Sequence, residues 1–298
     1  MSKSTSPLTV VLESGSTRAT AAIITPDTAR IDYTDLPHGH NAASAPDGHL
    51  SELIGSTTRL LEIAHQVSEI HFYGAGCAGK DCCQRVADEL QLHFPHATIA
   101  VYSDMLAAAR ALCGDRPGIV GILGTGSNSC LYDGSEIVSN VSPLGYILGD
   151  EGSGAVLGRL FLGRMLKRQF SGHLVERFER VYPTLTPDEA VRRIYRQARP
   201  NAFLASLCPF IASCLDSPEV IDFVVEEFLR YIDYNLTSYP GYESLPIHFV
   251  GSIAHHFAPQ LTEALSRRQL HLGTILPTPL PSLAAYHLSR NVNSTHTK

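Results

Sequence analysis

The chain has little that would place it in a membrane or on a nucleic acid. No stretch approaches the roughly 18 consecutive apolar residues that a membrane-spanning helix needs. Its 29 acidic residues outnumber its 23 basic residues, and the formal net charge is −6. Nucleic-acid-binding domains usually carry a basic face, and anionic lipids attract basic segments, so this balance disfavours both partners. A small-molecule substrate is the simplest partner that remains.

Closely paired cysteines are also absent. The seven cysteines form no C-x-x-C pair, whereas zinc and iron–sulfur sites need such close spacings. The first seven residues are polar and serine-rich, without the basic and apolar regions of a secretion signal. We therefore expect reduced thiols and a cytoplasmic protein.

The composition that is present suits a globular fold. Of the 298 residues, 44% are hydrophobic and 17% are charged, which is enough apolar material for a sizeable core. Domains usually hold about 100–200 residues, so this length predicts one large or two modest domains.

One pattern occurs twice, about 110 residues apart. A short apolar strand is followed by a turn rich in glycine, serine and threonine and then by two further strands. The pattern predicts strands at 8–12, 19–25 and 31–35 in the first copy and at 119–123, 128–132 and 137–140 in the second. Helices at 50–67, 80–92 and 104–112 alternate with strands at 70–73 and 98–102, and later come a mostly helical segment (152–239), a strand (247–250) and a last helix from 281. The sequence therefore predicts an α/β fold with two lobes, each a mixed sheet flanked by helices.

The two repeated turns have the composition of phosphate-binding loops. They are Glu13-Ser14-Gly15-Ser16-Thr17-Arg18 and Gly124-Thr125-Gly126-Ser127-Asn128. Glycine lets a ligand approach the backbone N–H groups, and serine and threonine hydroxyls add donors. A carboxylate such as that of Glu13 suits Mg²⁺, directly or through water. Either turn alone also fits an ordinary β-turn, but the duplicated position favours a shared role.

Three further motifs carry candidate chemistry. Ser103-Asp104 follows a strand and opens a helix, a position that suits a general base acting on a substrate hydroxyl, although it also suits a helix cap. Asp150 and Glu151 lie among the glycines of 145–154, where they suit the hydroxyls of a sugar, although the segment also suits an ordinary loop and helix cap. Gly251-Ser252 lies between a strand and a helix, where adenosine can pack, although this is also a common connection between a strand and a helix.

Taken in order, these motifs resemble the actin/hexokinase/chaperone ATPase superfamily and, within it, the N-acetylglucosamine kinases and the BadF/BadG/BcrA/BcrD ATPase family. The likeness spans most of the chain and is carried by residues 14–17, Ser103-Asp104 with Ala107-Ala108, 121–128, 149–153 and 250–252. It implies a two-lobed actin-like (ribonuclease H-like) fold. One lobe would comprise 1–115 with the helix 281–298 packed back on it, and the other would comprise 116–280 with a helical insertion.

The resemblance also implies roles for individual residues. Asp104 would be the catalytic base, and Glu13 would hold Mg²⁺ through water. The implied ATP-binding residues are Ser14, Gly15, Ser16, Thr17, Arg18, Gly124, Thr125, Gly126, Ser127, Gly251 and Ser252. The implied sugar-binding residues are Asn41, Asp104, Asn128, Gly145, Asp150 and Glu151. The implied reaction is ATP-dependent phosphorylation of an amino sugar, with N-acetylglucosamine to its 6-phosphate favoured, in a homodimer.

The chain departs from the family pattern at two of these positions. Glu13 stands where the family usually has aspartate, and Arg18 where it often has lysine. The extra methylene of glutamate displaces the carboxylate by about 1.5 Å, the length of one carbon–carbon bond. Two alternatives therefore stay open: a nucleotide-hydrolysing regulator or activator that needs no sugar, and a weakly active family member that binds the sugar.

Overall fold

The computed structural model describes residues 7–295. The described chain forms two compact units. One comprises the residues up to Gly114 together with those from Pro279 onward, and the other comprises Asp115–Thr278. Within the described part, no helix combines the length and the apolar character required to cross a bilayer.

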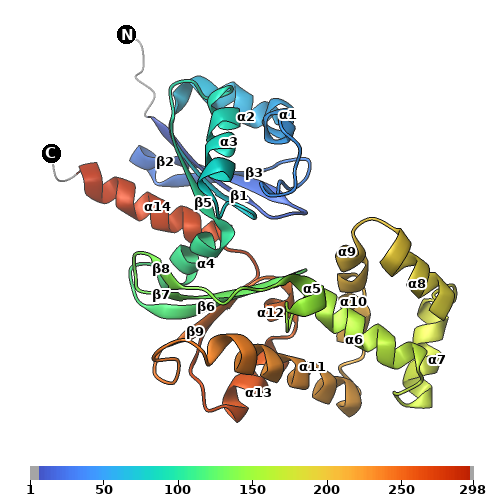
Figure 1. Ribbon diagram of the computed structural model, residues 1–298. Coiled ribbons are helices and arrows are strands. Elements are labelled where there is room, and N and C mark those ends of the chain that lie inside the picture. The colour runs from blue at the N-terminus through green and yellow to red at the C-terminus, as the bar shows by residue number, and fades with distance from the viewer. Residues whose placement is uncertain (1–6, 296–298) are drawn as a thin grey trace, which may run out of the picture. The chain divides into compact units, whose positions relative to one another are not determined.

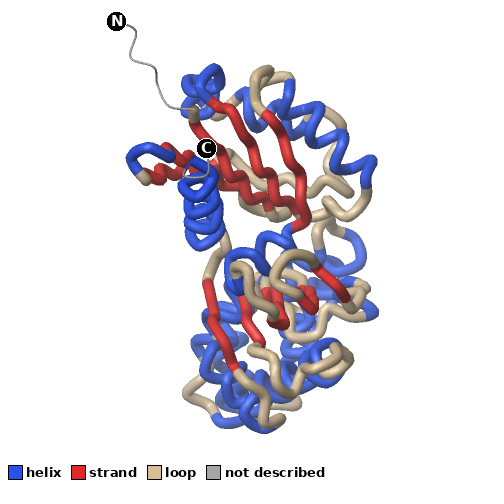
Figure 2. Tube along the Cα trace, turned by 90° about the vertical axis from the view of Figure 1, so that its left-hand side faces the viewer, coloured by secondary structure: helices blue, strands red, loops and turns tan. Residues whose placement is uncertain are grey.

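A five-stranded mixed sheet forms the centre of the first unit. Its order is β3-β2-β1-β4-β5, with β1 (Leu8–Ser14), β2 (Ala19–Thr25), β3 (Arg30–Asp35), β4 (Val67–Gly74) and β5 (Thr98–Ser103). The first three strands form an antiparallel meander, while β1, β4 and β5 run parallel. The strands run side by side and helices flank them (Figure 2). The remaining elements are α1 (His49–Gly55), α2 (Thr58–Ile63), α3 (Lys80–Gln91), α4 (Asp104–Cys113), α14 (Leu280–Thr295) and the 3-10 turns η1 (Pro26–Thr28) and η2 (Ala64–Gln66).

Both faces of this sheet are covered. Because side chains alternate along β1, Val10 and Leu12 pack into a core with α1, α2 and α3, whereas Val11 packs on the opposite face with α4 and α14. Figure 1 shows α14 in red beside α4, and the two helices are in contact. Helix α14 therefore completes a core to which β1 and β2 also contribute.

The second unit repeats the arrangement. Its sheet has the order β10-β9-β6-β7-β8, with β6 (Gly118–Leu123), β7 (Ser127–Tyr132), β8 (Ile137–Ser139), β9 (Ile247–Val250) and β10 (Leu272–Leu276). Three antiparallel strands are again followed by two parallel ones, so the predicted fold of two mixed sheets is confirmed. Its helices are α5 (Gly145–Leu148), α6 (Gly154–Leu166), α7 (Gly172–Val181), α8 (Pro187–Arg196), α9 (Pro200–Ala205), α10 (Cys208–Ser213), α11 (Pro218–Tyr231), the π-helical segment η3 (Ile232–Leu236), α12 (Ser252–His256) and α13 (Ala258–Arg267).

The structure differs from the sequence prediction at two elements. The helix expected over 50–67 is broken into α1, α2 and η2, because the hydroxyls of Ser56 and Thr57 donate to the Leu53 carbonyl at 2.9 and 2.8 Å and so end the first helix. Strand β10 was not predicted. Its Gly273, a residue that weakens strand patterns, lies where a Cβ would come within 2.5 Å of the His248 ring.

Candidate functional site

The first predicted phosphate turn connects β1 to β2. The N–H of Gly15 donates to the carbonyl of Arg18 at 2.9 Å and closes the turn. The hydroxyl of Ser14 is fully buried, donates to the His40 carbonyl at 3.0 Å and accepts from the His40 N–H at 2.8 Å. Ser16 and Thr17 are exposed. Ser14 therefore fastens the following loop, while the exposed hydroxyls of Ser16 and Thr17 can still donate to a ligand.

The loop that Ser14 fastens brings Asn41 to the same turn. The side-chain amide of Asn41 donates to the hydroxyl of Ser16 at 3.0 Å, and its oxygen accepts from the Ala43 N–H at 3.1 Å. Gly39 lies so close to the turn that a Cβ there would be 2.1 Å from the Gly15 carbonyl oxygen. The structure therefore places the predicted sugar residue Asn41 against the predicted phosphate turn.

A motif that was not recognised in the sequence supports this loop. Residues 74–79 read G-A-G-C-A-G, follow β4 and precede α3, and thus have the spacing of a dinucleotide-binding fingerprint. In the structure the carbonyl of Ala75 accepts from the Ala42 N–H at 2.9 Å. A Cβ on Gly76 would lie 2.5 Å from the Ala43 nitrogen. These contacts explain the glycine at 76 by its close packing against the Asn41 loop.

Glu13 and Asp104 form an acidic pair in the first unit. Glu13 is the second-last residue of β1, and Asp104 opens α4, where the hydroxyl of Ser103 accepts from the Leu106 N–H at 3.2 Å. Burial, and then the negative charge of Asp104, raise the pKa of Glu13 to about 7, although Arg18 acts in the opposite direction. Burial also raises the pKa of Asp104. Two acids in a poorly solvated place favour a shared proton or a bound cation.

The donor set of this pair fits Mg²⁺ in part. Carboxylate oxygens are suitable ligands, and Mg²⁺ commonly takes one or two of them together with water and substrate phosphates. No group of three or more His, Cys, Asp or Glu residues suited to a metal ion occurs in the part of the chain that the structure describes. Glu13 would therefore hold the ion only together with a phosphate ligand and water.

The second predicted phosphate turn connects β6 to β7. The N–H of Gly124 donates to the Gly126 carbonyl at 2.9 Å. The carbonyls of Gly124 and Thr125 accept from Gly154 and Ala155, the first two residues of α6, at 2.8 and 3.0 Å. Since these carbonyls already have partners, the turn is left with N–H groups and the exposed Thr125 side chain to offer a ligand.

Asp150 lies against this turn. Its backbone has a left-handed conformation with φ of 54°, and its N–H donates to the Pro143 carbonyl at 2.8 Å. A Cβ on Gly126 would be 3.1 Å from an Asp150 carboxylate oxygen, so the glycine makes room for the acid. Burial, and to a smaller degree Glu151, raise the pKa of Asp150 to about 6, while a hydrogen bond from the Ser127 backbone lowers it. Asp150 is therefore mostly ionised at pH 7, where its carboxylate can accept hydrogen bonds.

The other predicted sugar residues of this unit lie near Asp150 and the second turn in sequence. The side-chain oxygen of Asn128 accepts from the Ser129 N–H at 2.9 Å and from Asn140 at 2.8 Å, which leaves its NH₂ group for a ligand. Glu151 accepts from the side chain of Asn235 at 3.3 Å. Gly145 lies at the exposed start of α5, with φ of 75°, and its carbonyl accepts from the N–H of Gly149, the residue before Asp150, at 2.7 Å.

Gly251 and Ser252 follow β9, next to the end of β6. Gly251 has φ of 120° and donates its N–H to the Leu276 carbonyl at 3.0 Å. A Cβ on Gly251 would lie 2.3 Å from the Leu123 carbonyl oxygen, one residue before the second turn. The predicted adenosine turn and the second phosphate turn are therefore neighbours within one unit.

We expect Gly251→Ala to destabilise the protein by about 2 kcal/mol, because the new methyl group meets backbone and the φ angle disfavours any side chain. Thermal unfolding measures the loss. Gly163→Ala is the matched control, since a Cβ at this α6 glycine meets nothing within 4 Å and should stabilise the helix by up to about 1 kcal/mol. Equal melting temperatures for the two variants would contradict this packing.

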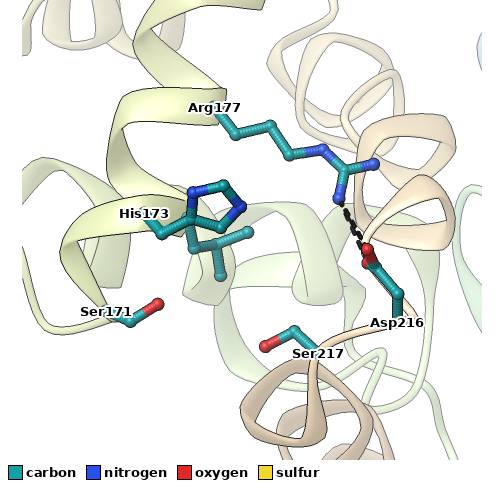
Figure 3. A pocket seen from close by; sticks show the side chains of 6 residues that line it. Ser171, His173, Arg177, Asp216 and Ser217 are labelled. Carbon is teal, nitrogen blue, oxygen red and sulfur yellow. Dashed lines mark hydrogen bonds and ion pairs between the residues drawn. The ribbon is translucent and has the colours of Figure 1, made fainter.

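A small cavity of about 210 Å³ lies elsewhere in the second unit (Figure 3). It is lined by Ser171, His173, Leu174, Arg177, Asp216 and Ser217, none of which is a predicted site residue. Several of its polar groups already have partners. Arg177 pairs with Asp216 at 3.1 Å, and Ser171 donates its N–H to Glu219 at 3.0 Å. We therefore assign the cavity no role.

Three solved structures show what the chain is similar to. A protein from Porphyromonas gingivalis that bears the provisional name N-acetylglucosamine kinase matches with a TM-score of 0.89 and 41% identity over 95% of this chain and 99% of that one. A protein from Chromobacterium violaceum with the same provisional name matches with a TM-score of 0.72 and 18% identity over 95% and 99% of the two chains. A ROK family glucokinase from Streptomyces griseus, solved with glucose and AMPPNP, shares the fold, with a TM-score of 0.53, 13% identity and coverage of 95% and 99%. No family model matches the chain, and no curated protein does.

Proposed function

We propose that this chain transfers the γ-phosphoryl group of ATP to O6 of N-acetylglucosamine and that it is of the BadF/BadG/BcrA/BcrD ATPase type. It belongs to the N-acetylglucosamine kinase-like family of the 41% identical P. gingivalis protein and is a sugar kinase of the actin-like ATPase fold. The observation that supports this most directly is the half-buried acid Asp104 at the start of α4, whose charge acts on Glu13 and which lies in the same unit as the first turn. The P. gingivalis protein, which is 41% identical, carries the same substrate in its name.

In the proposed reaction the sugar O6–H bond breaks as O6 bonds to the γ-phosphorus and ADP leaves. Asp104 accepts the O6 proton, because its carboxylate lies at a helix start where its oxygen also accepts from the Met105 N–H at 2.9 Å and is held in place. The sugar is oriented by Asn41, Gly145, Asp150, Glu151 and the NH₂ group of Asn128.

The phosphates are bound by N–H and hydroxyl groups. The proposed phosphate ligands are Ser16, Thr17 and Arg18 of the first turn and, in the second turn (124–127), the N–H groups of Thr125 and Gly126, because those of Gly124 and Ser127 donate to the Gly126 carbonyl and to Asp150. Gly251-Ser252 would lie against adenosine. Mg²⁺, held through Glu13, would neutralise charge on the transferred group. Positioning and charge neutralisation therefore supply most of the catalysis.

An ATP-consumption assay over a panel of hexoses and amino sugars tests the proposal. We expect N-acetylglucosamine to stimulate ADP release, with a sugar 6-phosphate as the product in mass spectrometry. ATP hydrolysis that no sugar changes would favour the regulator or activator alternative. Sugar binding without turnover would favour a weakly active member of the family. The reason for this alternative is Glu13, which stands where the family usually has aspartate. We place the reaction in the cytoplasm, where ATP is available.

A further inference from the structure

We infer that Tyr231, Asn235 and Tyr239, here called the anchor residues, are positioning residues for the sugar-binding side of the second unit. They lie at the end of α11, in η3 and just after it. All three are buried, with exposed fractions of 0%, 6% and 1%. The inference rests on the proposed function, because it concerns the segments that hold Asn128, Gly145 and Glu151.

Tyr231 holds β7 at Asn128. Its hydroxyl donates to the Asn128 carbonyl at 2.9 Å. A Cβ on Gly121 would lie 2.7 Å from that hydroxyl, so the glycine of the adjacent strand makes room for it. On the other side, a Cβ on Gly152 would lie 3.0 Å from the Tyr231 Cβ. One side chain therefore contacts both β7 and the segment that follows Glu151.

Asn235 holds the carboxylate of Glu151. Its NH₂ group donates to Glu151 at 3.3 Å and to the Tyr231 carbonyl at 3.1 Å, so both of its hydrogens are used. Asn235 lies in the π-helical segment η3, whose neighbouring residues Asp233 and Tyr234 are exposed. The wider π turn points a single polar side chain inward, and such segments recur at functional sites.

Tyr239 joins β7 to the connection between β8 and α5. Its hydroxyl is hydrogen-bonded to the hydroxyl of Ser129 at 2.7 Å and accepts from the Val141 N–H at 2.9 Å. Val141 lies four residues before Gly145, and Ser129 follows Asn128. Tyr239 therefore fixes the spacing of two segments that carry proposed sugar ligands.

The anchor residues are more polar than packing requires. They lie against the apolar core of the second unit, where phenylalanine and leucine would pack without the cost of burying polar groups. Apart from the bond of Asn235 to the Tyr231 carbonyl, their side-chain hydrogen bonds run to Asn128, Ser129, Val141 and Glu151. The carbonyls of the second phosphate turn are instead held by α6. Loss of a hydrogen bond from an anchor residue should therefore weaken the binding of the sugar more than the binding of ATP.

Steady-state kinetics of Asn235→Leu and Tyr239→Phe test the inference. We expect the KM for N-acetylglucosamine to rise about 5–20-fold in each, as expected for a hydrogen bond of about 1–2 kcal/mol, with the KM for ATP changed less than twofold. Tyr182→Phe is the control, because Tyr182 packs its ring on Phe178 and Phe210 in the same core, away from these segments. Equal rises in both KM values, or a lower melting temperature without a change in either KM, would overturn the inference.

Hydrogen exchange provides a readout that needs no substrate. Amides in 127–131 and around Val141 should exchange faster in Tyr239→Phe, and amides around Glu151 should exchange faster in Asn235→Leu, than in the wild type and in Tyr182→Phe, while the rest of the second unit exchanges as before. Unchanged exchange in these segments would overturn the inference. The wild-type sugar assay tests the proposed function separately. A wild type that phosphorylates no sugar would contradict the proposed function, whereas unchanged hydrogen exchange would contradict the inference about the anchor residues.

Discussion

Replacing Asp104 with asparagine should lower kcat by about 10²–10⁴-fold and leave the affinity for the sugar largely unchanged if Asp104 is the proposed base, because the amide cannot take up the O6 proton. The structural bonds survive, since the asparagine oxygen can still accept from the Met105 N–H, which is 2.9 Å from the present carboxylate. A coupled ADP assay measures turnover, and calorimetry measures sugar binding.

Asp81→Asn is the matched control for this experiment. Asp81 is also an acid in the first turn of a helix of the first unit, but it is exposed, so its loss should leave turnover within about twofold. Near-normal phosphorylation by Asp104→Asn would remove Asp104 from the mechanism. Loss of sugar binding together with turnover would show that its role is in binding rather than in proton transfer.

Glu13→Gln stabilises the protein at pH 8 and changes its stability little at pH 4.5. Burial and Asp104 raise the pKa of Glu13 from 4.5 to about 7, which corresponds to roughly 3 kcal/mol at most. Since the folded form holds the proton more tightly than the unfolded form, this stabilisation is complete below pH 4.5 and is lost as the pH rises to about 7. Glutamine cannot ionise, so it avoids the cost of a buried charge at pH 8.

Melting temperatures of the wild type and Glu13→Gln across this pH range measure the effect. Glu62→Gln is the control, because the Glu62 side chain is 59% exposed and should change stability by less than about 0.5 kcal/mol at either pH. A difference between wild type and Glu13→Gln that is independent of pH would mean that Glu13 does not titrate in this range.

The same variant tests the proposed Mg²⁺ ligand. A bound cation favours the ionised carboxylate, so Mg²⁺ with ATP should raise the melting temperature of the wild type at pH 8 more than that of Glu13→Gln. Equal increases would show that Glu13 does not contribute to cation binding. Glu13→Asp shortens the side chain to the family's usual length, and an unchanged rate would show that the longer side chain does not limit activity.

The sequence predicted the features whose signals are local. The two turns, 13–18 and 124–128, and the strands around them are marked by apolar runs and by glycine with serine or threonine. Because the same signals recur about 110 residues apart, even the duplication of the sheet was visible before the structure. The contacts of Gly126 with Asp150 and of Ser16 with Asn41 came only from the structure, since residues far apart in sequence meet there.

Other features depend on tertiary contacts that no local pattern reveals. Strand β10 pairs in parallel with β9, and its ladder shifts register where the His248 ring nitrogen accepts from the Thr274 N–H at 3.0 Å and leaves room only for glycine at 273. The π-helical turn that directs Asn235 inward follows α11 without any break in the apolar spacing of that helix. The glycines at 74–79 match a known fingerprint, yet their contacts with Ala42 and Ala43 give them a different use.

The return of α14 to the first sheet has a consequence for biosynthesis. Leu280, Leu283 and Ala284 share a buried cluster with Val11, Ala22 and Ile24, whose codons precede theirs by more than 250 positions. During synthesis, one apolar side of the first sheet would therefore stay exposed until residues 280–284 have emerged from the ribosome, while the intervening unit can already fold. A nascent chain stalled before residue 280 should accordingly recruit chaperones that a full-length chain no longer needs.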